Sequence, residues 1–178
     1  AEEPEPFGDN GTKMAWNTFN VVSLYPNGNP TLSDVNQRWV GDCCACAVFA
    51  SMAYLYPRFI KHIIKDNKDK TYTVTMYDPT GKQIPVGVSG DYFIGNSGDL
   101  GALGGRNKEV TWATSLEKAM MKWRQVYLGS SNVGGIGTEY VSAIFTGDGE
   151  SVGFGAGAFI AEDLQRAVEV SLKQGRLV

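Results

Sequence analysis

The sequence has little of several features that mark common classes of protein. It contains one histidine and three cysteines in 178 residues, and the cysteines lie within the four positions from Cys43 to Cys46. Such a cluster cannot form the disulfide framework of a small secreted domain, and it leaves the redox compartment undecided. The longest nearly uninterrupted apolar run, Cys43 to Tyr56, is shorter than the roughly 18 to 20 residues that a membrane-spanning helix needs. We therefore expect a core helix here and no membrane span.

Basic residues are not concentrated in any segment. Sixteen Lys and Arg against nineteen Asp and Glu give a net charge of -3, which argues against a protein that tracks nucleic-acid phosphates. Residues 1–6 are acidic and proline-rich, and they lack the basic start and apolar stretch of a signal peptide. We expect a soluble protein, and the sequence leaves open whether it is cytoplasmic or, after removal of a signal peptide, secreted or located in the cell envelope.

The composition fits one packed α+β domain. Hydrophobic residues make up 43% of the chain, and a chain of this length buries about two-thirds of its unfolded surface. Residues 1–36 are rich in Pro, Gly, Asn and Asp, which predicts an extended arm, and the packed domain is expected over residues 37–178. The hypothesis that the arm is a propeptide remnant rests only on its position.

Apolar spacing and turn residues predict the regular elements. The clearest helix runs from Thr111 to Trp123, and Asp42 is expected to cap the helix that follows it. Glycine-rich loops are expected at 95–105, 129–137 and 147–157. The remaining expected elements are helices at 43–56, 58–65, 138–145 and 161–174, a hairpin of strands 72–77 and 84–88, and the opening of a strand at 176–178.

One stretch carries residues suited to acyl transfer. Gln37 lies six residues before Cys43, which opens a predicted helix. A thiol at the positive end of a helix is favoured in its ionised, nucleophilic form. The backbone N–H of Cys43 and the side-chain amide of Gln37 can converge on the oxygen of an attacked carbonyl.

Spacing alone does not distinguish this site from ordinary packing. A cysteine in an apolar helix is commonly a small buried residue, and a glutamine is commonly on the surface. A zinc site built from the cysteines and His62 is disfavoured, because adjacent cysteines on one helix point in divergent directions. The glycine clusters lack the lysine and the strand-to-helix context of phosphate loops.

Several segments, in order along residues 25–178, resemble the calpain family of papain-like cysteine proteases. The resemblance is carried by Gln37, by Gly41-Asp42-Cys43 with Ala47, Ala50 and Ser51 in the following helix, by the Trp112–Ala119 segment, by Gly134-Gly135 and by Phe145-Thr146-Gly147.

This resemblance implies that residues 37–178 form the mainly helical nucleophile lobe of a papain-like protease core. Cys43 would be the nucleophile, and Gln37 would donate to the oxyanion. Gly134 and Gly135 would form a backbone ledge that pairs with an extended peptide substrate, since glycine allows close approach of another main chain. The implied function is a cysteine endopeptidase that cleaves peptide bonds through a thioester at Cys43 and requires no cofactor for the chemistry.

Two departures from the family pattern matter. Cys44 stands where the family usually has a tryptophan. The catalytic histidine and asparagine belong to a second lobe that this chain does not include, so His62 is expected to be a structural or surface residue. That lobe would come from the same precursor, either in the same polypeptide or as a separate chain. The alternative function is a non-catalytic calpain-like binding or regulatory module.

The resemblance also implies that calcium can bind. Its carboxylate ligands would be Asp34, before the nucleophile, and Glu109, which lies one residue away from the family's position. Both are of a type that is ordinarily solvated at the surface.

Overall fold

The computed structural model describes residues 3–9, 12–20, 22–95, 98–150 and 160–178, and it is a mixed α+β structure. The helices are α1 (Cys43–Leu55), α2 (Pro57–Ile63), α3 (Trp112–Leu128), α4 (Thr138–Thr146) and α5 (Ala161–Lys173), with a 3-10 helix η1 (Leu32–Asp34). The strands are β1 (Gly8–Asp9), β2 (Thr12–Lys13), β3 (Ala15–Thr18), β4 (Ile64–Asp66), β5 (Tyr72–Tyr77), β6 (Gln83–Val88) and β7 (Asp91–Ile94).

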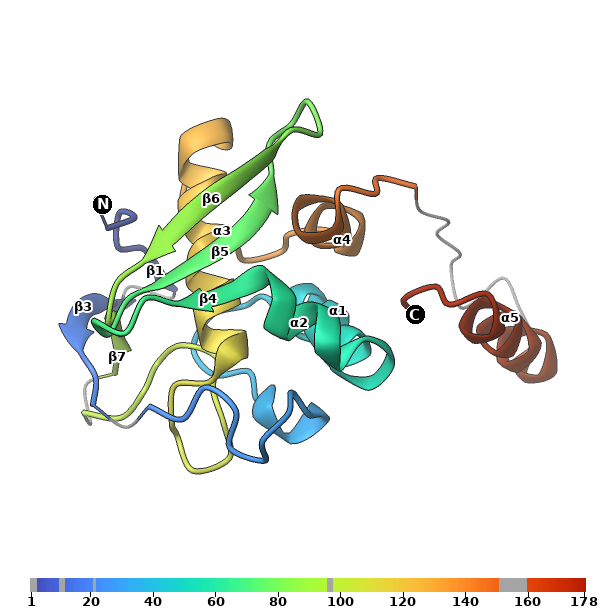
Figure 1. Cartoon of the computed structure of the whole chain (residues 1–178), viewed down its shortest axis with the longest axis horizontal. Helices are drawn as coiled ribbons and strands as arrows, with labels where there is room; N and C mark the ends of the chain where they lie inside the picture. Colours follow the sequence, from blue (N-terminus) through green and yellow to red (C-terminus); the bar gives the residue numbers. More distant parts are fainter. Residues whose placement is uncertain (1–2, 10–11, 21, 96–97, 151–159) are drawn as a thin grey trace.

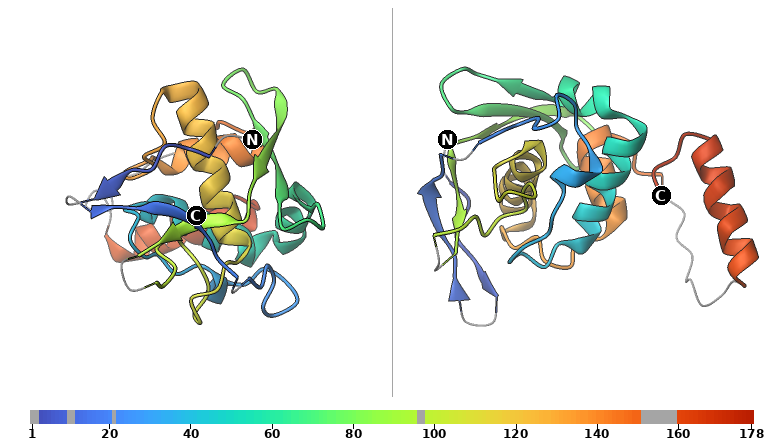
Figure 2. Two further views of the ribbon diagram at one scale, coloured as in Figure 1. Left: turned by 90° about the vertical axis from the view of Figure 1, so that its left-hand side faces the viewer. Right: turned by 90° about the horizontal axis from the view of Figure 1, so that it is seen from below.

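Helix α3 lies at the centre of the domain. It packs against β5 and β6 (Figure 1), and α1 and α4, which contact each other, lie beside it (Figure 2); α4 also contacts β5. The expected apolar face is present, but every residue from Trp112 to Met121 is buried. The helix also continues beyond the predicted end at Trp123, to a left-handed Gly129 whose amide donates to the Gln125 carbonyl.

The predicted hairpin is confirmed as β5 and β6, which pair antiparallel from Tyr72↔Val88 to Tyr77↔Gln83. The side chains of β5 alternate between buried and half-buried positions, as the alternating sequence predicts. The helix predicted to reach Lys65 ends at Ile63 instead. Residues Ile64–Asp66 form β4, which pairs antiparallel with β5. Apolar spacing did not reveal this change, because a strand of three residues is too short to show an alternating pattern of its own.

The segment before Gln37 has more regular structure than predicted. Strand β3 pairs antiparallel with β7, and Trp16 stacks on Phe93 with 3.9 Å between the ring centroids. The Trp16 indole donates to the Pro4 carbonyl at 2.7 Å. These contacts attach the amino-terminal segment to the domain.

A buried lysine strengthens this attachment. Lys118 of α3 is 2% exposed, and its ammonium lies 2.5 Å from the Glu3 carboxylate and 4.5 Å from the centre of the Trp16 ring. It also donates to Ser89 Oγ at 2.8 Å. Burial lowers the pKa of Lys118, and the neighbouring Glu3 carboxylate opposes that shift.

Helix α5 lies apart from the rest of the domain in Figure 1, and none of its residues is buried. The strand expected to open at 176–178 is absent from the described residues. Instead, the Val178 amide donates to Ser51 Oγ at 3.1 Å and Tyr56 Oη donates to the Gly175 carbonyl, which holds the end of the chain against α1. Residues 151–157 of the loop predicted at 147–157 lie outside the described residues.

No single helix in the described ranges is both long and apolar enough to cross a bilayer. Helices α1 and α2 meet the length and composition test only as a pair, and that pair is bent by 112°.

The packing of Trp16 predicts that β3 contributes to stability. We expect Trp16→Ala to lower the free energy of unfolding by about 3 kcal/mol, because it removes a ring stacked on the core. The exposed neighbour Asn17→Ala is the control and should change stability by less than about 0.5 kcal/mol. Urea unfolding measures both. Equal, near-zero effects would mean that the amino-terminal segment is a detachable arm.

Candidate functional site

Cys43 is the first residue of α1, and its side chain is exposed. Its backbone amide belongs to the first turn, where N–H groups have no acceptor within the helix. All three cysteines are free; Cys44 is half-buried, and Cys46 Sγ donates to Asp42 Oδ1 at 3.8 Å. Burial raises the pKa of Cys44 and, to a larger extent, that of Cys46. Cys43 is therefore the accessible thiol of the three.

Gln37 lies in the loop before α1, and its side-chain amide donates to the Val40 carbonyl at 2.9 Å. No hydrogen bond joins Gln37 to Cys43 in the part of the chain that the structure describes. The amide must leave the Val40 carbonyl before it can donate to a substrate oxygen.

Gly134 and Gly135 lie in the loop between α3 and α4, beside the residues that precede Cys43. The amide of Gly135 donates to the Gly41 carbonyl at 3.1 Å. Gly135 has a positive φ of 69°, a left-handed conformation that glycine adopts without strain. The structure thus brings the predicted ledge and the predicted nucleophile segment together.

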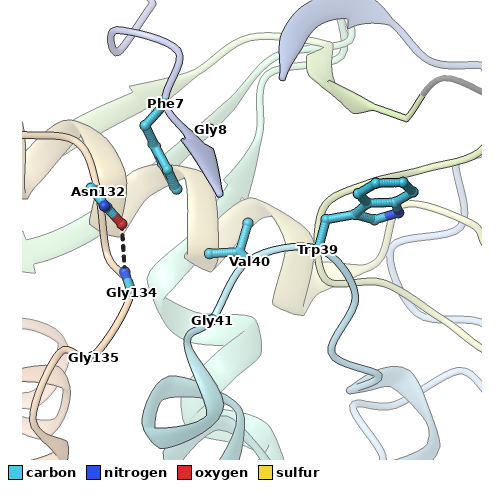
Figure 3. Close-up of a pocket in the computed structure, with 8 residues that line it drawn as sticks. All are labelled: Phe7, Gly8, Trp39, Val40, Gly41, Asn132, Gly134 and Gly135. Atoms are coloured by element: carbon cyan, nitrogen blue, oxygen red, sulfur yellow. Dashed lines mark hydrogen bonds between the residues drawn. The ribbon is translucent and has the colours of Figure 1, made fainter. Parts of the chain in front are cut away.

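The loop of Gly134 and Gly135 and the residues that precede Cys43 line a common pocket of about 280 Å³. It is lined by Trp39, Val40 and Gly41, by Asn132, Gly134 and Gly135, and by Phe7 and Gly8 of the amino-terminal segment. Figure 3 shows the side chains of Phe7 and Val40 pointing toward each other, with the two glycines on one side and Trp39 on the other. The pocket therefore has walls from three parts of the sequence.

Asn132 was not anticipated from the sequence. Its side-chain oxygen accepts a hydrogen bond from the Gly134 amide at 2.9 Å (Figure 3). A substrate carbonyl would compete with Asn132 for this donor. An asparagine two residues before a glycine pair is a common turn signal, and no sequence pattern marked it as a site residue.

Asp42 does not act as the expected cap of α1. Its carboxylate makes no hydrogen bond to the described amides of the first turn, and the residue is fully buried. The side chain turns inward instead and hydrogen-bonds to Glu117 of α3, a residue that is 1% exposed. Burial raises the pKa of both carboxyl groups, and the charge of Asp42 adds to the shift at Glu117. A buried partner on α3 replaces the local capping interaction.

The expected calcium ligands are buried, and the expectation that they are solvated was wrong. Asp34 Oδ2 accepts hydrogen bonds from Trp112 Nε1 and from the Thr31 amide, both at 2.8 Å. Glu109 is 7% exposed, and its Oε2 has no hydrogen-bond partner among the described residues. Calcium usually takes six to eight oxygen ligands, and the described residues contain no group of three or more His, Cys, Asp or Glu that could hold a metal. These two carboxylates do not make a calcium site by themselves, and calcium binding stays a prediction.

His62 lies in the last turn of α2, and its side chain is exposed. It forms no hydrogen bond or ion pair with the described residues. This position fits the surface role predicted for it.

The buried acid pair predicts a dependence of stability on pH. The folded protein keeps a proton on the pair after an unfolded carboxyl, with a pKa of about 4, has lost it. The free energy of unfolding should therefore fall, by up to about 1.4 kcal/mol per pH unit, as pH rises from about 4 toward the raised pKa of the pair. Glu117→Gln should remove this slope, and the exposed Glu162→Gln should keep it. Urea unfolding between pH 4 and 8 measures the slopes, and identical slopes in all three proteins would contradict the shared proton.

A comparison of the sequence with protein-family models finds no matching family, and a search of curated proteins finds no match.

Proposed function

We propose that this chain carries the nucleophile half of a calpain-like cysteine endopeptidase, with Cys43 as the nucleophile. The observation that carries the proposal is the hydrogen bond between the Gly135 amide and the Gly41 carbonyl, together with the pocket beside it. This bond joins the loop of Gly134 and Gly135 to Gly41, two residues before Cys43, whose thiol is exposed at the start of α1. An extended peptide on that ledge would pass close to Cys43 and bring a peptide carbonyl to the sulfur.

The chemistry divides between this chain and a second lobe. Cys43 Sγ attacks the substrate carbonyl carbon and forms a carbon–sulfur bond, while the thiol proton passes to a histidine of the second lobe, oriented there by an asparagine. The oxyanion accepts hydrogen bonds from the Cys43 amide and from the Gln37 side chain. The intermediate then expels the amine, which takes the proton from the histidine, and water hydrolyses the thioester.

The exposed position of His62 supports assigning the proton acceptor to another part of the protein. Gln37 requires a local change, because its amide donates to the Val40 carbonyl in this structure. Substrate binding can supply that change, since a developing oxyanion is a stronger acceptor than a peptide carbonyl.

A non-catalytic binding module is the second candidate. It is favoured by two internal hydrogen bonds, from Gln37 to Val40 and from Gly134 to Asn132, which occupy donors that a substrate would need. Such a module would keep the pocket and bind a peptide without cleaving it. Replacing Cys43 distinguishes the two, because only the enzyme depends on the thiol.

Cys43→Ser should lower the kcat/KM of the complete protein, with its second lobe, for peptide hydrolysis by at least about a thousandfold, because the hydroxyl is a poor substitute for the thiol. Cys44→Ser should retain activity within about tenfold, since Cys44 does not carry the reaction. A peptidase assay with a mixed peptide library measures both. Unchanged turnover in Cys43→Ser would refute the assignment.

Gln37→Ala should lower kcat by about 100-fold to 1000-fold, because it removes one donor to the oxyanion. The KM should change much less, since the donor acts on the transition state. Gln37→Glu keeps the size but not the donor and should be similarly impaired. Steady-state kinetics at neutral pH test this, and an effect confined to KM would assign Gln37 to substrate binding alone.

A further inference from the structure

Two buried carboxyl groups meet beneath the start of α1. Asp42 directly precedes Cys43, and Glu117 comes from the buried part of α3. Their side chains hydrogen-bond to each other. Glu117 Oε1 also accepts a hydrogen bond from the Leu103 amide at 3.1 Å, and Asp42 Oδ1 accepts one from Cys46 Sγ at 3.8 Å. The start of α1, the middle of α3 and the Leu103 loop are therefore connected at one point.

The raised pKa of both carboxyl groups, caused first by burial, favours one retained proton on the pair. Two carboxylates in contact and out of solvent repel each other too strongly for both to be ionised. The remaining oxygens, Asp42 Oδ2 and Glu117 Oε2, are buried and find no other partner among the described residues. A proton on one carboxyl satisfies the other carboxyl as well and removes the cost of leaving a buried acceptor unpaired.

The location of the pair links it to the thiol. Asp42 has a non-helical backbone with φ of -106° and ψ of 42°, and the helix starts at the next residue. Because its side chain points into the core, the path of the main chain into Cys43 depends on what holds Asp42 there. A shift of Asp42 is transmitted to Cys43 through a single peptide unit.

We propose that Glu117 is a positioning residue for Cys43, which holds the Asp42 side chain through one shared proton and thereby fixes the first turn of α1. This inference deepens the proposed function. Its consequence for catalysis rests on Cys43 being the nucleophile. The placement of the thiol itself is measurable without turnover.

The groups that face the pair limit what can titrate there. Among the described residues, Cys46 is a further titratable side chain that contacts the pair, and burial, followed by the charges of Asp42 and Glu117, raises its pKa. The Leu103 loop contributes a backbone amide, which does not titrate. Loss of the shared proton, once pH rises above the raised pKa of the pair, would place two negative charges against each other and release the start of α1.

The test measures alkylation of Cys43 by iodoacetamide in the whole chain, with peptide mass spectrometry to separate it from Cys44 and Cys46. Glu117→Gln can donate to Asp42 and still accept from Leu103, so it replaces the protonated carboxyl. Glu117→Leu fills the space of the glutamate side chain but offers no hydrogen-bond partner to Asp42. Glu162→Gln on α5 is the matched surface control. Circular dichroism confirms that each variant is folded.

We expect Glu117→Leu to change the Cys43 alkylation rate by about tenfold or more and to reduce selectivity for Cys43, because small misplacements of a reacting group carry large rate costs. Glu117→Gln should remain much closer to the parent protein. The ratio of the Glu117→Gln rate to the parent rate should also change as pH rises from 6 to 10, since only the parent pair can lose its shared proton. The Glu162→Gln ratio should stay constant.

A pH-independent ratio for Glu117→Gln, with unchanged selectivity, would overturn the positioning role, and this readout remains decisive if Glu117→Leu fails to fold. The expected alkylation pattern without Cys43-dependent peptidase activity in the complete protein would instead refute the proposed function and leave the positioning role intact. Cys43-dependent activity with identical alkylation in every variant would refute the positioning role and leave the proposed function intact.

Discussion

The burial of α3 is the constraint on which the rest of this domain depends. Polar side chains along its buried half each have a partner on a different element. Lys118 reaches Glu3 in the amino-terminal segment, Glu117 reaches Asp42 at the start of α1, and Thr114 donates to the Leu103 carbonyl. Each bond compensates a polar group for the loss of water, and each ties another segment to the helix.

The same arrangement creates the candidate site without placing any of its pocket residues on α3. The helix fixes α1 from beneath through Asp42, and it leads into the loop that carries Gly134 and Gly135. The Gly135 amide then closes the connection to Gly41. The exposed Cys43 thiol and the loop that carries Gly134 and Gly135 are therefore positioned by one buried scaffold.

Sequence patterns predicted the parts of this structure that are determined locally. The helical spacing from Trp112 onward and the alternation from Tyr72 to Tyr77 each identify a face that one element must bury. Asp42 illustrates what local patterns could not predict, because its position suggests a cap while its actual partner is 75 residues away at Glu117. Asp34 and Glu109 were expected in solvent for the same reason: their residue type suggests exposure, and the buried surroundings come from distant segments.

The pocket walls come from residues 7–8, 39–41 and 132–135, so nearly three-quarters of the chain separates the first wall from the last. During synthesis the ribosome must release the α3–α4 loop before the groove can exist, even though the cysteine-bearing helix has emerged long before. A nascent chain therefore displays its thiol before the pocket next to it exists, and the peptide binding that we propose for this pocket would become possible only late in folding.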